Sequence, residues 1–362
     1  MSISEASARA ALSQLVDPNT GKDLVSGGAV RNLRVDDGEV SVDIELGYPA
    51  RSQIDLIRRL VGSKLAELPG VGKITANVYQ KIAAHAVRRG LKTLPTVKNI
   101  IAVASGKGGV GKSTTAVNLA LALAAEGASV GMLDADIYGP SQPMMLGIEG
   151  RPESRDGKTL EPMLGHGIQA SSIGFMIDAD TPMVWRGPMV TQALEQLLRE
   201  TNWRDLDYLI IDMPPGTGDI HLTLSQKIPV TGAVIVTTPQ DIALLDARKG
   251  LKMFEKVGIP ILGIVENMAI HVCSNCGHAE HIFGQGGGER IAKEYGVEYL
   301  GGLPLDIRIR EQADSGRPTV VADPDGETAE TYRRIARRVA VRIGEQVRDA
   351  RTDFPPIIVQ DT

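Results

Sequence analysis

Apolar residues alternate with polar ones near the start of the chain. Between residues 40 and 46 every second residue is apolar, which predicts a strand with one buried face. Residues 54–68 repeat apolar side chains at helical spacing until Pro69-Gly70 ends the pattern, and residues 73–78 predict a returning strand. The front of the chain, residues 1–80, is therefore predicted to be a small α/β unit.

The pattern changes after a basic segment at residues 81–98, which Gly90 and Pro95 interrupt and which we interpret as a linker. Beyond it, short and unbroken apolar runs alternate with helical segments. The runs are residues 99–104, 129–133, 208–211, 232–237, 261–265 and 299–303. Because strands covered on both faces are apolar throughout, this order predicts a doubly wound, mostly parallel sheet over residues 99–350. The tail at 351–362 is expected to be loosely ordered.

Composition narrows the possible partners and locations. The 362 residues suffice for two domains, and a net charge of −5 does not favour nucleic acid or an anionic membrane as a partner. No run approaches the roughly 20 apolar residues of a membrane span, and the N-terminus has no signal-peptide pattern, so we expect a cytoplasmic protein. The chain has 2 cysteines, which excludes a disulfide scaffold and places all thiol chemistry together.

A glycine-rich loop follows the apolar run at 99–104 and opens the next helical segment. It reads Gly106-Lys107-Gly108-Gly109-Val110-Gly111-Lys112-Ser113, followed by Thr114. Glycines at this spacing let backbone N–H groups surround phosphates, while the lysine at the helix start adds a positive charge and the serine hydroxyl can hold Mg²⁺. The loop predicts that a nucleoside triphosphate binds these residues together with magnesium.

Asp212 ends the apolar run at 208–211, where an acidic residue can hold magnesium through water. The glycine-rich turn at 213–219 can then sense a γ-phosphate through its backbone amides. Asp219 alone has a second explanation, because an aspartate also caps helix N-termini.

Two further carboxylates, Asp134 and Asp136, follow the run at 129–133 and could meet the same metal site. The alternative is that they start a turn before Gly139-Pro140. After the run at 261–265, Asn267 carries an amide that offers both a donor and an acceptor to a base edge, and we expect it to contact adenine.

The cysteines form one short motif, Cys273-Ser274-Asn275-Cys276, among three histidines at 271, 278 and 281. Three alternatives remain open: an iron–sulfur cluster shared by two subunits, a zinc site completed by histidines, and a redox pair or inert thiols. A four-iron cluster takes four thiolates, and a two-fold axis supplies them from two copies of one pair. The first alternative therefore predicts a homodimer. The motif is too compact for zinc-finger spacing.

Lys107 gives the loop its resemblance to the deviant Walker A ATPases, in which this lysine reaches the nucleotide of a dimer partner. Together with the segments at 134–141, 212–219 and 266–268 and with the cysteine pair, the loop resembles the Mrp-type iron–sulfur cluster carriers. That resemblance spans residues 99–344. It implies that Lys107, Lys112 and Asp136 are catalytic, with Asp136 positioning water and Asp134 supporting magnesium, and that the nucleotide is ATP.

The front unit resembles the MIP18-type domain through residues 16–18 and 22–25, but Ala50 stands after Pro49 where that domain commonly has cysteine. Docking of a target protein is thus the expected role. The resemblance implies a homodimeric ATPase that takes a cluster, expected to be [4Fe–4S], from an upstream scaffold to apoproteins.

Two other functions were weighed against this one. The basic amphipathic segment at 332–348 leaves a membrane- or nucleoid-associated positioning ATPase as the alternative, although packing against the sheet is the commoner explanation of such a helix. An ATP-gated electron donor like the nitrogenase iron protein is disfavoured, because its cluster ligands are single cysteines far apart in sequence.

Overall fold

The computed structural model describes residues 3–85, 91–177 and 187–352. Its contacts divide the chain into two compact units: Met1–Ala83 together with Ala340–Thr362, and Ala84–Val339. The second boundary falls inside the 26-residue helix α11 (Glu327–Thr352). The sequence analysis instead predicts that the larger domain spans residues 99–350. A continuous helix carries no break in composition, so no sequence pattern indicates a boundary there.

The first unit contains a three-stranded sheet in the order β1-β2-β3, with α1 (Glu5–Leu12) and α2 (Ile54–Ala66). β2 (Glu39–Leu46) pairs antiparallel with β1 (Val30–Asp36) and parallel with β3 (Ile74–Gln80). Alternate residues of β2 are buried, as the period of two requires, and α2 buries one face through Ile57, Val61 and Leu65. The predicted small α/β unit is confirmed.

The second unit is built on a nine-stranded, mostly parallel sheet in the part of the chain that is described. Its strands are β4 (Val97–Ala104), β5 (Val130–Asp134), β6 (Met163–Gly165), β7 (Ile168–Ser172), β8 (Leu206–Asp212), β9 (Gly232–Thr237), β10 (Ile261–Val272), β11 (Ala279–Glu280) and β12 (Tyr299–Pro304). They follow the order β11-β10-β9-β4-β8-β5-β7-β6, with β12 on β10. The predicted fold class is confirmed.

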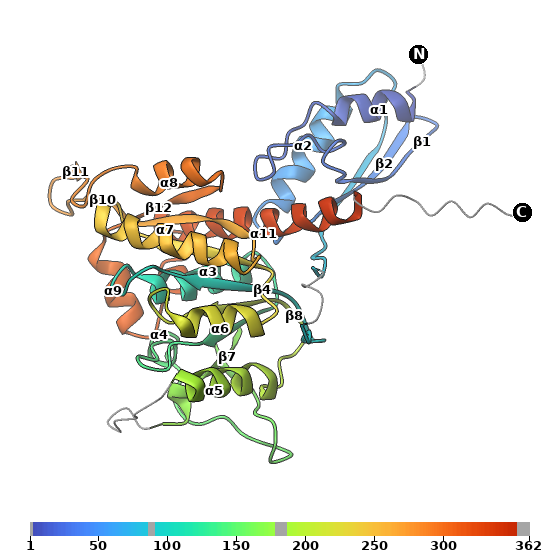
Figure 1. Cartoon of the computed structure of the whole chain (residues 1–362). Coiled ribbons are helices and arrows are strands. Elements are labelled where there is room, and N and C mark those ends of the chain that lie inside the picture. Colours follow the sequence, from blue (N-terminus) through green and yellow to red (C-terminus); the bar gives the residue numbers. More distant parts are fainter. Residues whose placement is uncertain (1–2, 86–90, 178–186, 353–362) are drawn as a thin grey trace, which may run out of the picture. The chain divides into compact units, whose positions relative to one another are not determined.

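Helices cover this sheet on both faces (Figure 1). They are α3 (Lys112–Ala125), α4 (Gln142–Met145), α5 (Gly187–Glu200), α6 (Asp219–Lys227), α7 (Asp241–Lys256), α8 (Gly287–Tyr295), α9 (Ile307–Asp314), α10 (Thr319–Ala322) and the start of α11, with a 3₁₀ turn at Ile173–Phe175. Ile100, Ala102 and Ala104 of β4 share one core with apolar residues of α5 to α8. The intervening Ile101 and Val103 are fully buried as well. Burial on both faces explains the unbroken apolar runs.

Three strands of the second unit lie outside the predicted set. β6 and β11 are very short. β7 has the sequence IQASS, whose polar residues do not form an apolar run. β10 also continues to Val272, so the segment 266–268, expected to follow a strand, lies inside one. The register of β10 against β12 shifts between Glu266 and Ile270, which marks an irregularity at this point.

The arginines of α11 pack against the second unit in the stretch up to Val339. Arg337 is buried and pairs with Glu126 at 2.5 Å and with Glu330 at 2.8 Å, while Arg338 pairs with Glu298. These contacts support packing as the explanation of the amphipathic pattern. No helix in the described parts of the chain is long and apolar enough to cross a membrane.

Candidate functional site

The glycine-rich loop joins the central strand β4 to α3. Gly111, the residue before α3, has φ +81°, and a Cβ there would lie 2.1 Å from Asn267 Nδ2. At Gly106 a Cβ would meet the backbone of Asp246 at 2.2 Å. Both positions require glycine, the first for its left-handed backbone and both for close approach. The loop is thus held between β10 and α7 with its N–H groups at the start of α3.

Lys112 and Asp212 form a buried ion pair at the end of the loop. Lys112 Nζ lies 2.5 Å from Asp212 Oδ1 and 3.1 Å from Ser113 Oγ. The two strands explain this meeting, because β4 and β8 are parallel neighbours with Val103 opposite Asp212. The predicted nucleotide and magnesium residues Lys112, Ser113 and Asp212 therefore lie together at the carboxyl edge of the sheet.

Gln142 belongs to the same cluster and was not predicted. Its Nε2 donates to Asp212 Oδ2 at 2.9 Å and to the Ser113 carbonyl at 3.2 Å, while its Oε1 is buried without a partner among the described residues. A glutamine carries no strong sequence signal for a nucleotide site. The one available signal is its position directly after the segment 134–141, which is part of the family resemblance.

Asp134 is fully buried beside this pair. It accepts hydrogen bonds from the Gln142 and Asp136 backbone N–H groups at 3.0 and 3.1 Å and from Ser172 Oγ at 3.2 Å. Burial, and then the charge of Asp212, raise its pKa from 3.8 to about 7. Burial likewise raises the pKa of the half-buried Asp136. The predicted carboxylates Asp134 and Asp136 are brought to the site by β5, the neighbour of β8.

The charges in this cluster suit a divalent cation. Two fully buried carboxylates, Asp134 and Asp212, share the single ammonium of Lys112. The unpartnered Oε1 of Gln142 adds a further oxygen. Oxygen donors with excess negative charge are the environment that Mg²⁺ prefers, and phosphate oxygens commonly complete its coordination. The residues present therefore fit magnesium bound together with a nucleotide.

Asn267 reaches the loop from the irregular part of β10. Its Nδ2 donates to the Val110 carbonyl at 2.9 Å, and the side chain is buried. The next residue, Met268, has φ +57°, an unusual conformation outside glycine that is typical of functional sites. Asn267 thus touches the phosphate loop directly. Its contact with adenine stays a prediction.

The remaining predicted residues lie on the loop and the first turn of α3. Lys107 is half-buried and its carbonyl accepts a hydrogen bond from Ser105 Oγ at 2.9 Å. Gly108 and Gly109 are exposed, whereas Thr114 is half-buried with its carbonyl bonded to Asn118. Their contacts with nucleotide stay predictions, as does the reach of Lys107 to a second subunit.

The cysteines stand on a hairpin at the far end of β10. The backbone N–H of Cys273 donates to the His278 carbonyl at 2.9 Å, and Gly277 donates back to Cys273 at 2.8 Å. Cys276 is exposed and Cys273 is half-buried. The N–H groups of Asn275 and Cys276 lower the pKa of the Cys273 thiol, which favours the metal-binding thiolate.

Two of the three nearby histidines are held by the backbone. His271 Nδ1 bonds to the Leu305 carbonyl at 2.9 Å and His281 Nδ1 to the Ala269 carbonyl at 2.7 Å, while His278 faces Glu280 at 3.4 Å. Across the described residues, no group of three or more histidine, cysteine, aspartate and glutamate side chains is placed to hold a metal ion.

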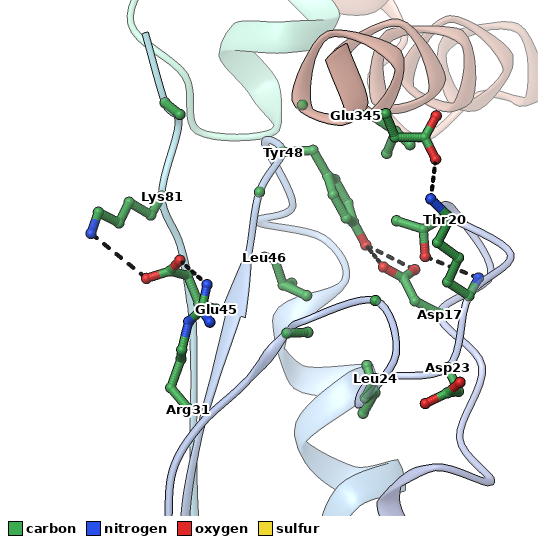
Figure 2. A pocket seen from close by; sticks show the side chains of 17 residues that line it. Asp17, Thr20, Asp23, Leu24, Arg31, Glu45, Leu46, Tyr48, Lys81 and Glu345 are labelled. Atoms are coloured by element: carbon green, nitrogen blue, oxygen red, sulfur yellow. Dashed lines mark hydrogen bonds and ion pairs between the residues drawn. The ribbon is translucent and has the colours of Figure 1, made fainter. Parts of the chain in front are cut away.

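A cavity of about 140 Å³ lies in the first unit (Figure 2). Tyr48 crosses it and donates from its hydroxyl to Asp17, a buried carboxylate. The charged side chains at its rim already face opposite charges, Lys22 with Glu345 at 2.9 Å and Arg31 with Glu45 at 3.1 Å. These four charges are therefore already paired within the first unit.

The fold and the site together define a P-loop nucleotide-binding protein. A family model described as NUBPL iron-transfer P-loop NTPase matches residues 96–340, and one described as iron-sulfur cluster assembly protein matches residues 5–78. The chain therefore belongs to the Mrp/NUBPL-type iron–sulfur cluster carrier P-loop NTPases and bears the MIP18-like N-terminal domain of that family.

The sequence is similar to those of known relatives over most of the chain. An iron–sulfur cluster carrier protein of Pseudomonas fragi is 63% identical over 274 residues, covering 75% of this chain and 96% of the relative. That of Escherichia coli K12 is 51% identical over 333 residues, covering 92% and 90%. The mouse iron–sulfur cluster transfer protein NUBPL is 52% identical over 254 residues, covering 70% and 80%.

Solved structures resemble the second unit. A nucleotide-binding protein of Archaeoglobus fulgidus in complex with ADP has a TM-score of 0.56 and 39% identity, covering 64% of this chain and 90% of that one. The cell-division ATPase MinD of Pyrococcus furiosus, with a TM-score of 0.51 and 22% identity, covers 67% and 98% and shares the fold.

Proposed function

We propose that this carrier is an ATP-hydrolysing homodimer that holds one iron–sulfur cluster between the paired Cys273 and Cys276 of both subunits and passes it to apoproteins. The observation that carries the proposal is the course of β10, which bears Asn267 on the phosphate loop and continues to the cysteine hairpin. An expected [4Fe–4S] cluster then takes its four thiolates from two copies of the hairpin.

In the proposed nucleotide site, loop N–H groups and Lys112 bind the ATP phosphates. Ser113, Asp212 and, as a supporting residue, Asp134 hold magnesium, which neutralises phosphate charge when bound. Asp136 orients the attacking water, and Lys107 reaches the nucleotide of the partner subunit. Each role is one of positioning or charge stabilisation, which is where catalysis of phosphoryl transfer mainly resides.

The proposed link between nucleotide and cluster runs along one strand. Asn267 and Cys273 are six residues apart, a strand length of about 20 Å. A shift of the loop on nucleotide binding is therefore delivered to the hairpin through Asn267. By linkage, cluster binding must change nucleotide affinity by the same factor that nucleotide changes cluster affinity.

Exposed apolar side chains at the carboxyl edge of the sheet, where β10 leads into the hairpin, support dimerisation at this edge. They follow three neighbouring strands: Ile242 and Leu245 on α7 after β9, Val272 on β10, and Ile307 on α9 after β12. Their exposures lie between 52% and 69%. Apolar groups clustered at one sheet edge favour a protein partner. A second copy with its hairpin adjacent to the first satisfies both the apolar surface and the cluster.

The cysteines provide the direct test. We expect anaerobically reconstituted protein to be a dimer with a visible iron–sulfur absorption band and to activate an apo-acceptor. Cys273→Ser and Cys276→Ser should each abolish stable cluster binding and transfer, because each removes two of four thiolates from the dimer. Ser274→Ala, on the same exposed turn, is the matched control and should behave as the unmodified chain.

Iron and sulfide content, size in solution and acceptor activation are measured on all three variants. Normal transfer by both cysteine variants, or a monomer that carries zinc or no metal after reconstitution, overturns the proposed cluster site. ATP hydrolysis is assayed separately, so the nucleotide part of the proposal can stand or fall independently.

A further inference from the structure

His221 is a buried histidine that the proposed chemistry does not use. It lies in the first turn of α6, next to the turn at 213–218 that follows Asp212, and is 2% exposed. Its Nε2 is hydrogen-bonded to the Pro214 carbonyl. Because a carbonyl can only accept, Nε2 must carry the proton, which leaves Nδ1 as a bare acceptor in the neutral ring.

Two further features distinguish His221 from an ordinary core residue. Burial lowers the pKa of His221, and the charge of Lys112 lowers it further. Nδ1 is buried and has no partner among the described residues. A buried acceptor without a partner among the described residues is costly, which distinguishes His221 from a residue that only fills the core.

The turn is held from two sides. Gly216 N donates to the Ser105 carbonyl at 3.1 Å, at the start of the phosphate loop. Pro215 lies against the same loop, since a Cβ at Gly108 would be 3.9 Å from its ring. On the other side, the His221 side chain is hydrogen-bonded to the Pro214 carbonyl of the turn. When the turn moves toward or away from a phosphate, either the hydrogen bond between His221 and Pro214 breaks or α6 moves with the turn.

We propose that His221 is the positioning residue that ties the nucleotide-facing turn to α6, so that the turn and α6 move together when nucleotide binds. The inference rests on the proposed ATP site and adds a residue to it. The Pro214 carbonyl is the contact, and α6 is the element that receives the movement. Helix α6 has no side-chain cap at Gly218, which leaves His221 as the described side-chain tether at its start.

The test compares His221→Leu, which removes the donor at similar volume, with His221→Gln, whose Nε2 can still donate to Pro214. For the Leu variant of the full chain we expect kcat for ATP hydrolysis to fall about 10- to 100-fold with KM changed less than threefold, because phosphate contacts remain while the turn is misplaced. The Gln variant should recover most of this loss.

Hydrogen–deuterium exchange supplies a readout that does not depend on turnover. In the unmodified chain, ADP and a non-hydrolysable ATP analogue should alter exchange in residues 213–218 and in α6 together. In His221→Leu the turn should still respond and α6 should not. A merely structural role predicts faster exchange throughout α6 with the nucleotide response unchanged.

Equal hydrolysis and equal coupled exchange in the Leu, Gln and unmodified proteins overturn the proposal. If the Leu variant does not fold, His221→Asn replaces it, since its shorter side chain keeps an amide but cannot reach Pro214. Asn and Gln variants that behave alike then overturn it. Hydrolysis by the unmodified chain is measured first: its absence contradicts the ATPase proposal, whereas its presence with unchanged variants contradicts the role of His221 alone.

Discussion

Helix α3 has a buried ion pair at each end, and the two pairs have the same N–O distance but different surroundings. At its start Lys112 lies 2.5 Å from Asp212, and at its C-cap Glu126 lies 2.5 Å from Arg337. The side chains of Lys112 and Asp212 are 6% and 0% exposed, and those of Glu126 and Arg337 are 1% and 5% exposed. Each helix residue also has the wrong sign for the helix dipole, a cation at the N-terminus and an anion at the C-terminus.

The two pairs differ in whether every buried charge has a counter-charge within the chain. Arg337 bonds Glu126 and also Glu330, so the buried anion and cation are both satisfied within the chain. Lys112 instead pairs with Asp212 beside a second buried carboxylate, Asp134, whose pKa is raised by burial and then by the charge of Asp212. The helix start and Lys112 attract phosphate, while the excess carboxylate attracts a metal ion. A satisfied buried pair holds the fold, and an incomplete one marks a binding site.

The largest expected effect comes from breaking the satisfied pair. Arg337→Met leaves Glu126 buried without a counter-charge and should cost about 3–5 kcal/mol of unfolding free energy. Urea unfolding of the second unit measures it. The matched double variant Glu126→Leu, Arg337→Met removes both charges and should lose much less. Equal losses in the single and double variants would contradict this interpretation.

Breaking the incomplete pair should act on activity. Lys112→Ala removes the ammonium group proposed to bind the ATP phosphates, and we expect ATP hydrolysis to fall about 100-fold or more. Lys256→Ala, an exposed lysine at the end of α7, is the control and should leave hydrolysis unchanged. Unchanged turnover in Lys112→Ala would remove the nucleotide-site assignment.

A smaller effect should appear in the pH dependence of stability. Because folding raises the pKa of Asp134 from 3.8 to about 7, its stabilising contribution is complete below pH 3.8 and is lost as the pH rises through 7. Without metal or nucleotide, the protein should melt about 2–4 °C lower at pH 8 than at pH 6. Asp134→Asn cannot ionise and should flatten this difference. Thermal melts in EDTA decide it, and an equally steep slope in the variant would exclude Asp134 as its source.

The smallest effect should come from an exposed pair of the same length. Arg58 and Asp55 on α2 are also 2.5 Å apart, but their side chains are 46% and 82% exposed. Arg58→Gln should change the free energy of unfolding by less than about 0.5 kcal/mol, because water screens the charges. Urea titration of the full chain measures the change. A loss comparable with that of Arg337→Met would show that distance, rather than burial, sets the strength of these pairs.

Much of the site could be predicted because its parts carry local signals. Gly111 and its neighbours form a loop that only such residues can build, and Asp134 and Asp212 each end an apolar run. Parallel strands bring such ends to one edge, so the sequence also predicts that these residues meet. Gln142 and His221 were not predicted, because glutamine and histidine occur in many settings that have no function. Their roles come from contacts with Asp212, 70 residues from Gln142, and with Pro214, 7 residues from His221.

The amino-acid sequence by itself determined the two-part α/β organisation, the phosphate loop and the cysteine pair, because backbone conformation and strand burial are fixed by residues close together in the chain. Only the tertiary structure decided which buried charges are satisfied. Glu126 and Arg337 are 211 residues apart and give no pattern, yet they meet with every charge compensated. Charge completion depends on what surrounds a group in space, and that is a property of the folded chain.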